Sequence, residues 1–140
     1  MLKYAPNHIK DFCFCDKKDE TYQRLSKKFQ SSYTSINKIR CICGNNSFHV
    51  YKDLHPTVLL NCSICDNAIV VYDLKYYPSA NKTNNSFPFE HVTYMGISIF
   101  EVYAIYEYSE DFESNDDISW CYIYIKSDNN LIELINDETS

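Results

Sequence analysis

The sequence predicts an α+β fold. Three observations predict it: apolar residues at helical spacing near the N-terminus, two close pairs of cysteines around a hairpin pattern, and alternating runs rich in Tyr and Ile near the end. At 140 residues, 45% of them apolar, the chain has the size and composition of one globular domain. The expected order is an N-terminal helix, a central zinc-ribbon hairpin and a C-terminal antiparallel β-meander. We expect four segments in one compact unit: 1–37, 38–75, 76–91 and 92–140.

The helix is expected in the first segment, from about Lys18 to Ser32. Tyr22, Leu25 and Phe29 recur at spacings of three and four residues, which places them on one face. Asp19 is a suitable N-terminal capping residue. The basic side chains on the opposite face are interpreted as a solvated flank, with a phosphate-facing surface as the alternative.

The second segment contains two cysteine turns, Cys41-Ile42-Cys43-Gly44 and Cys62-Ser63-Ile64-Cys65, with 18 residues between Cys43 and Cys62. Strand patterns at 47–51, 57–60 and 68–73 accompany them. Zn²⁺ takes four ligands at tetrahedral angles, and two cysteine turns facing each other across a hairpin can supply all four. Gly44 suits a backbone position with positive φ. Four thiolates leave no open position for water, so the sequence predicts a structural Zn²⁺ held by Cys41, Cys43, Cys62 and Cys65.

Several alternatives for the cysteines and histidines stay open. The four cysteines could be buried, reduced thiols without a metal, and His49 or His55 could replace one of them as a ligand. Cys13, Cys15 and Cys121 could form a second site together with a histidine. Cys13 and Cys15 could equally be small hydrophobic residues packed beside Phe12 and Phe14.

The third and fourth segments read as a loop and a sheet. Residues 76–88 are polar, rich in Asn and bounded by prolines, which indicates that the segment 76–91 is a surface loop or linker. Strand patterns follow at 96–108, 118–126 and 131–135, joined by loops at 109–117 and 127–130. On the second of these strands Trp120, Tyr122 and Tyr124 share one face, opposite an aliphatic face. We expect this aromatic face to be mostly core, with a binding surface as the alternative.

Charge divides the chain into two halves. The net charge is −6, but residues 1–60 carry ten bases and five acids (+5), whereas the remainder carries three bases and fourteen acids (−11). An acidic end repels nucleic acid and attracts basic partners. With only 2 glycines the chain lacks a Gly-rich phosphate loop. It also lacks a long apolar run and a signal-peptide pattern, so we expect a cytoplasmic protein that does not enter a membrane.

Two stretches of the sequence each resemble part of a known protein family. Residues 40–48, followed by 60–65 and the strand 69–73, resemble the zinc ribbon of small bacterial cytosolic proteins. The acidic residues 106–112, 116–120 and 137–139 look like the C-terminal part of bacterial immunity proteins of polymorphic toxin systems, including contact-dependent growth inhibition systems. The resemblance implies a non-enzymatic module that neutralises a cognate toxin, a basic protein.

Such a module presents acidic and aromatic side chains to its partner, because complementary charge speeds the encounter and aromatic anchors supply affinity. The loop at 109–117 and the neighbouring strand have that composition. The predicted partner-binding residues are Glu110, Asp111, Glu113, Asp116, Asp117, Trp120, Tyr122 and Tyr124.

Two other functions are weighed against this one. A nucleic-acid-associated zinc ribbon could use the bases of the N-terminal half, Lys17, Lys18, Arg24, Lys27, Lys28, Lys38 and Arg40, although the net charge of −6 opposes it. An enzyme with Cys13, Cys15 or Cys121 as nucleophile and His8 or His91 as base is the third possibility, and no hydrolase or deaminase motif supports it.

Overall fold

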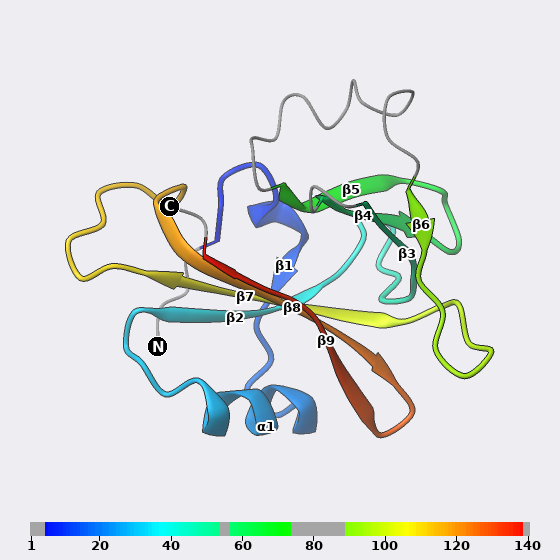
Figure 1. The fold of residues 1–140 in the computed structure, drawn as a ribbon, viewed down its shortest axis with the longest axis horizontal. Helices are drawn as coiled ribbons and strands as arrows, with labels where there is room; N and C mark the ends of the chain where they lie inside the picture. Colours follow the sequence, from blue (N-terminus) through cyan, green and yellow to red (C-terminus); the bar gives the residue numbers. More distant parts are fainter. Residues whose placement is uncertain (1–4, 54–56, 74–88, 139–140) are drawn as a thin grey trace.

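The computed structural model describes residues 5–53, 57–73 and 89–138 and shows a mostly β protein. Of these residues 49% are in strands and 10% are helical. The strands form two antiparallel sheets, with one α-helix in the described part of the chain (Figure 1). The predicted α+β order of helix, central ribbon and C-terminal meander is therefore wrong. Segments from both halves of the chain build one sheet, and the ribbon strands belong to the other.

Sheet A has five strands and contains both the N-terminal and the C-terminal part of the chain. The short 3₁₀ helix Lys10–Phe12 leads into it, and α1 (Glu20–Lys28) connects its first two strands. In spatial order the strands are β1 (Cys13–Phe14), β2 (Thr34–Ile39), β7 (Glu101–Tyr108), β8 (Ile118–Ser127) and β9 (Asn130–Glu138).

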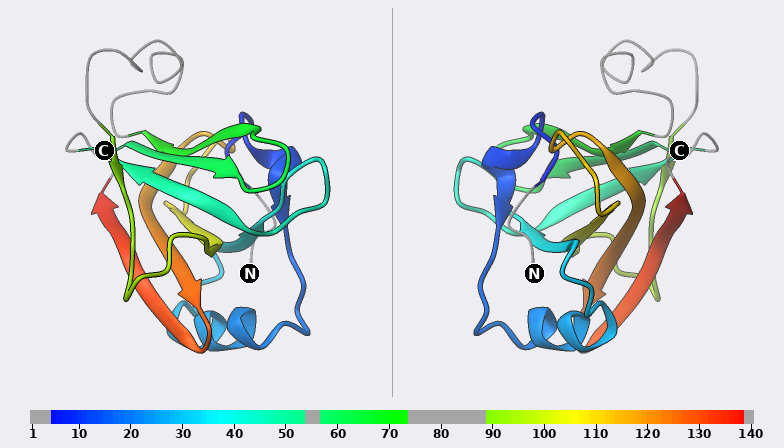
Figure 2. Two further views of the ribbon diagram at one scale, coloured as in Figure 1. Left: turned by 90° about the vertical axis from the view of Figure 1, so that its right-hand side faces the viewer. Right: turned by 90° about the vertical axis from the view of Figure 1, so that its left-hand side faces the viewer.

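Sheet B has four strands and packs against one face of sheet A (Figure 2). The main core lies between the sheets and includes Leu60 of sheet B with Val102 and Ile123 of sheet A. A backbone bridge between Phe48 and Phe100 joins the two sheets. In spatial order the strands of sheet B are β5 (Ala68–Asp73), β4 (Thr57–Cys62), β3 (Phe48–Lys52) and β6 (Glu90–His91).

Helix α1 covers part of the opposite face of sheet A, so the molecule has three layers (Figure 2). Tyr22, Leu25 and Phe29 are buried against this sheet, which confirms the predicted apolar face. The helix spans Glu20–Lys28 and is therefore shorter than the predicted 18–32. Asp19 occupies the N-cap position, but its carboxylate makes no capping bond and instead accepts a hydrogen bond from the Tyr103 hydroxyl (2.5 Å).

Strand β2 was not predicted, because only two of its six residues are large and apolar. It pairs with β7 from Thr34 to Lys38, and β1 pairs with its last two residues, Lys38 and Ile39. Three small polar residues, Thr34, Ser35 and Asn37, are buried in it. The Asn37 amide donates hydrogen bonds to the Ser35 hydroxyl (3.1 Å) and to the Ala104 carbonyl (3.2 Å). These hydrogen bonds replace the ones that the Asn37 amide would make with water in the unfolded chain.

The predicted strands are confirmed; the strand at 68–73 has the predicted ends, and the ends of the others are shifted. The strand predicted at 96–108 begins only at Glu101. Met95 and Gly96 adopt positive φ (50° and 81°) in a turn closed by the bridge between Tyr94 and Ile97, and Phe100 pairs with Phe48 of sheet B. The last strand is longer than predicted and reaches Glu138. Of the predicted loop at 76–91, residues 76–88 lie outside the described residues, and Glu90–His91 form β6.

Candidate functional site

The four predicted metal ligands lie on two turns at one end of sheet B. Cys41 and Cys43 lie in the connection from β2 to β3, and Cys62 and Cys65 lie at the β4–β5 turn. In the first turn the Gly44 N–H donates to the Cys41 carbonyl (2.8 Å), and in the second the Asp66 N–H donates to the Cys62 carbonyl (3.1 Å). Each bond curls the backbone so that both cysteines of a turn face the same point.

The sulfur atoms form a compact tetrad. All four Sγ atoms lie within 4.8 Å of one another. The Sγ atoms of Cys41 and Cys65 are 3.4 Å apart, and those of Cys43 and Cys62 are 3.6 Å apart. Four sulfurs bonded to one Zn²⁺ at about 2.3 Å lie about 3.8 Å apart at tetrahedral angles. The tetrad therefore has the size and donor set of a four-thiolate metal centre.

Two asparagines support the tetrad in the same way. Gly44 (φ 94°) and Asp66 (φ 63°) have positive φ, as predicted for Gly44, and each is followed by an asparagine. The Asn45 amide donates to the Cys62 sulfur (3.3 Å), and the Asn67 amide approaches the Cys41 sulfur (4.0 Å). Each asparagine thus reaches the first cysteine of the opposite turn. The matching triplets 43–45 and 65–67 were the overlooked sequence signal for these supporting residues.

Asn45 also ties the two turns together through Ser47 and Ser63. Its amide donates to the Ser47 carbonyl (2.7 Å) and to the Ser63 hydroxyl (3.0 Å). The Ser63 hydroxyl and backbone N–H both donate to the Ser47 carbonyl (2.9 and 3.1 Å). These bonds hold the two turns in position by contacts that do not pass through the sulfur atoms.

The surroundings of the sulfurs shift the pKa values of Cys62 and Cys65 in opposite directions. Burial raises the pKa of Cys62, but N–H groups of Cys65, Asn45 and Ile64 outweigh burial and lower this pKa to about 6. At Cys65 an N–H of Asn67 lowers the pKa, but the neighbouring thiols and burial outweigh it and raise the pKa to about 12. Cys62 is therefore the sulfur best prepared to be a thiolate, the form that binds metal.

The remaining cysteines and histidines do not join this centre. Among the described residues no second cluster of potential metal ligands is found. Cys121 is buried between the sheets, Cys13 lies in β1, and Cys15 is exposed. His49 on β3 lies next to His91 on the neighbouring strand β6, with ring centroids 5.5 Å apart. It does not belong to the tetrad. His55 lies outside the described residues.

The predicted acidic residues lie on the loop between β7 and β8, where two of them have structural contacts. Asp116 accepts hydrogen bonds from the backbone and side-chain N–H groups of Asn7 (2.9 and 3.1 Å). Asp117 accepts from the N–H groups of Glu113 and Ser114 (3.2 and 3.0 Å). These two carboxylates therefore shape the loop and attach it to the N-terminal segment.

The other three acids of the loop point their charge outward. Glu110, Asp111 and Glu113 are all exposed. Asp111 accepts a hydrogen bond from the Ser109 hydroxyl (2.9 Å). No hydrogen bond or ion pair to the carboxylates of Glu110 and Glu113 is found within the described ranges. Glu110 and Glu113 are the loop charges that can meet a partner without disturbing the fold.

The three predicted aromatic residues form a row on the helix side of β8. Tyr124 is buried beneath α1, and its hydroxyl accepts a hydrogen bond from the Lys28 ammonium (2.9 Å). Tyr122 contacts the Phe29 ring, with centroids 4.5 Å apart. Trp120 is half-buried and belongs to neither of the core clusters. The face is therefore core at one end and accessible at the other.

The basic residues of the N-terminal half are spread over several elements. Lys28 contacts Tyr124, Lys38 forms an ion pair with Glu101 (3.0 Å), and Arg40 lies 3.9 Å from the Phe14 ring centroid. Arg24 donates to the Asn129 carbonyl (3.2 Å). Lys17 and Lys18 lie just before α1, and Lys27 is exposed on it.

Comparisons of the chain with protein-family models, curated proteins and solved structures find no match. Within the described ranges, no helix is both long enough and apolar enough to cross a membrane.

Proposed function

We propose that Cys41, Cys43, Cys62 and Cys65 hold one structural Zn²⁺. The proposal is supported by the size of the sulfur tetrad and by the N–H donors around Cys62. Sulfur-only donor sets favour Zn²⁺ over hard cations such as Mg²⁺ and Ca²⁺, which take oxygen ligands. Since four thiolates complete the tetrahedral shell, the metal would stabilise the two turns and would not activate a water molecule.

We further propose that the protein is a non-enzymatic binding module, an immunity protein that neutralises a basic toxin. The observation that carries this proposal is the accessible Trp120 beside a loop whose Glu110 and Glu113 carboxylates have no partner in the described part of the chain. Carboxylates at the edge of an interface attract a basic partner and speed its encounter, while a central aromatic side chain supplies affinity.

Two of the three cysteines outside the tetrad, Cys13 and Cys121, are poorly suited to act as nucleophiles, which supports the non-enzymatic proposal. Burial raises the pKa of Cys13 to about 12 and raises that of Cys121 well above its ordinary value. Both side chains are therefore protonated at neutral pH, and a protonated thiol is a poor nucleophile. His8 is engaged with the Val70 carbonyl (3.0 Å).

Affinity capture tests the proposed function. The tagged, zinc-loaded protein is used to retain partners from its own cells, with and without nuclease treatment. We expect one basic protein in both samples. Retention that disappears with nuclease would instead support the nucleic-acid alternative and its basic N-terminal half.

Charge variants then test the surface with the captured protein. We expect Glu110→Gln with Glu113→Gln to lower the association rate by about tenfold at low salt and to weaken its salt dependence. The matched control is Glu90→Gln with Asp128→Asn, which removes the same charge from exposed residues elsewhere. Equal association rates for the two double variants would contradict the acidic surface.

A further inference from the structure

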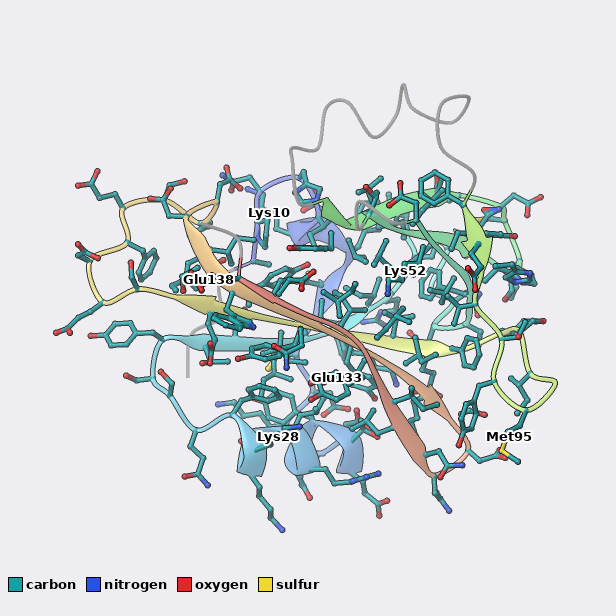
Figure 3. The ribbon with its side chains drawn as sticks, in the orientation of Figure 1. Lys10, Lys28, Lys52, Met95, Glu133 and Glu138 are labelled. Atoms are coloured by element: carbon teal, nitrogen blue, oxygen red, sulfur yellow. The ribbon has the colours of Figure 1, made fainter. Side chains whose placement is uncertain are left out.

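The aromatic row on the helix side of sheet A already binds one cation of the protein itself. The Lys28 ammonium lies 5.4 Å from the centroid of the Tyr124 ring and 5.7 Å from that of Phe29. Glu133 accepts a hydrogen bond from the Tyr124 hydroxyl (2.9 Å). This end of the row therefore combines a cation, aromatic faces and a carboxylate, an arrangement that attracts and holds an exposed ammonium. Figure 3 shows Lys28 and Glu133 in the part of the molecule where α1 faces sheet A.

The other end of the row repeats this composition without a cation. Trp120 pairs with Glu107 on β7 and with Glu138 on β9, so a glutamate stands opposite it on each neighbouring strand, on the same face of the sheet. In Figure 3 Glu138 lies beyond the end of α1, away from Glu133. Of the cations in the described ranges, none lies over the Trp120 ring.

The indole is held in place by its neighbours. Its Nε1–H donates to the Asn136 side-chain oxygen (2.7 Å), and its ring stacks with Tyr122 (centroids 6.3 Å apart, planes at 23°). The Tyr122 hydroxyl donates to the Glu107 carboxylate (3.1 Å), which fixes that carboxylate beside the row. A receptor that is already oriented loses little side-chain entropy when it binds.

We propose that Trp120, Glu107 and Glu138 form a receptor for one arginine side chain of a basic partner. The guanidinium plane stacks on the indole face, and its N–H groups donate to the two carboxylates. Arginine fits better than lysine because its planar group combines stacking with several directed hydrogen bonds. The inference rests on the proposed function for its partner, but the receptor has its own test.

The test uses a tetra-arginine amide peptide and the fluorescence of Trp120, the only tryptophan in the chain. Titration of the zinc-loaded protein should give a saturable change in emission. Tetra-lysine amide should bind at least about threefold more weakly, because an ammonium cannot stack. Equal affinities for both peptides, or no saturable change, would overturn the proposal.

Charge-neutral variants identify the carboxylates. We expect Glu107→Gln with Glu138→Gln to weaken tetra-arginine binding by about tenfold. A glutamine at 107 can still accept the Tyr122 hydrogen bond, so the row is preserved. The control is Glu90→Gln with Asp128→Asn, which removes the same charge from exposed residues outside the receptor and the acidic loop and should change the affinity by less than about threefold. Equal effects of both double variants would overturn the receptor.

The outcome of the peptide titration is independent of the outcome of the affinity capture. If the receptor binds tetra-arginine but no basic protein is captured, the receptor stands and the proposed function fails. If a basic protein is captured whose affinity is unchanged in the Glu107→Gln, Glu138→Gln variant, the proposed function stands and the receptor fails as its docking point.

Discussion

At the scale of single residues, the two cysteine turns bring together four sulfurs and the amides that surround them. The N–H donors around Cys62 come from its own turn and from Asn45, which belongs to the opposite turn. A metal-bound thiolate retains negative charge, and hydrogen bonds from outer residues orient such ligands. Asn45 and Asn67 are therefore part of the centre although they are not expected to touch a metal.

Removal of one sulfur tests the centre. We expect Cys62→Ser to abolish stoichiometric zinc, and we expect the protein to unfold or aggregate, because structural zinc contributes about 10 kcal/mol in small zinc peptides. Zinc content by elemental analysis and thermal unfolding by circular dichroism measure this. Cys15→Ser is the control, because Cys15 is exposed and outside the tetrad. A Cys62→Ser protein with unchanged melting temperature would argue against a structural metal.

At the scale of elements, α1 holds its place through three buried side chains and not through a capping bond. Leu25 is 1% exposed and lies in the cluster with Ile36, Tyr103 and Ile105 of sheet A. The helix has nine residues, too few to be stable alone in water. Its formation therefore depends on the sheet face that it covers.

Truncation of Leu25 tests this dependence. We expect Leu25→Ala to lower the free energy of unfolding by about 2–5 kcal/mol, because the substitution leaves a cavity against sheet A. Lys27→Ala, on the exposed side of the helix, should change it by less than about 0.5 kcal/mol. Urea denaturation of both zinc-loaded variants measures the difference. Similar losses for the two would mean that the helix does not depend on its buried face.

At the scale of the whole molecule, burial of neutral thiols between and beside the sheets couples stability to pH. Burial raises the pKa of Cys13 from 9.0 to about 12, and it raises the pKa of Cys121 as well. A raised pKa in the folded state means that folding favours the protonated thiol. This contribution is complete below about pH 9, the unfolded value, and is lost as the pH rises towards the folded value.

We therefore expect the free energy of unfolding to fall between pH 9 and about pH 12. Tyr122 acts in the same direction, because burial and then Glu107 raise its pKa from 10.0 to about 12. Urea denaturation at a series of pH values measures the slope. The Cys13→Ala variant should lose part of the slope, and a slope identical to that of the unchanged protein would contradict the assignment to Cys13.

The sequence by itself determined features that depend on local chemistry. Spacing of three and four residues identified the buried face of α1, and alternation identified the strands of the meander. The cysteine tetrad was also predictable, because each pair is close in sequence and needs only one turn to face the other pair. The repeated Gly/Asp-Asn ending of the two turns was equally visible.

Only the tertiary structure decided how these elements combine. Strand β2 has a polar sequence and becomes a strand because β7 pairs along it and the Asn37 side chain donates hydrogen bonds to Ser35 and Ala104. Its pairing with β7 joins residues about seventy positions apart, so no local pattern encodes it. The same packing decides that α1 covers Tyr124 and leaves Trp120 accessible, since burial depends on what lies opposite a residue and not on its type.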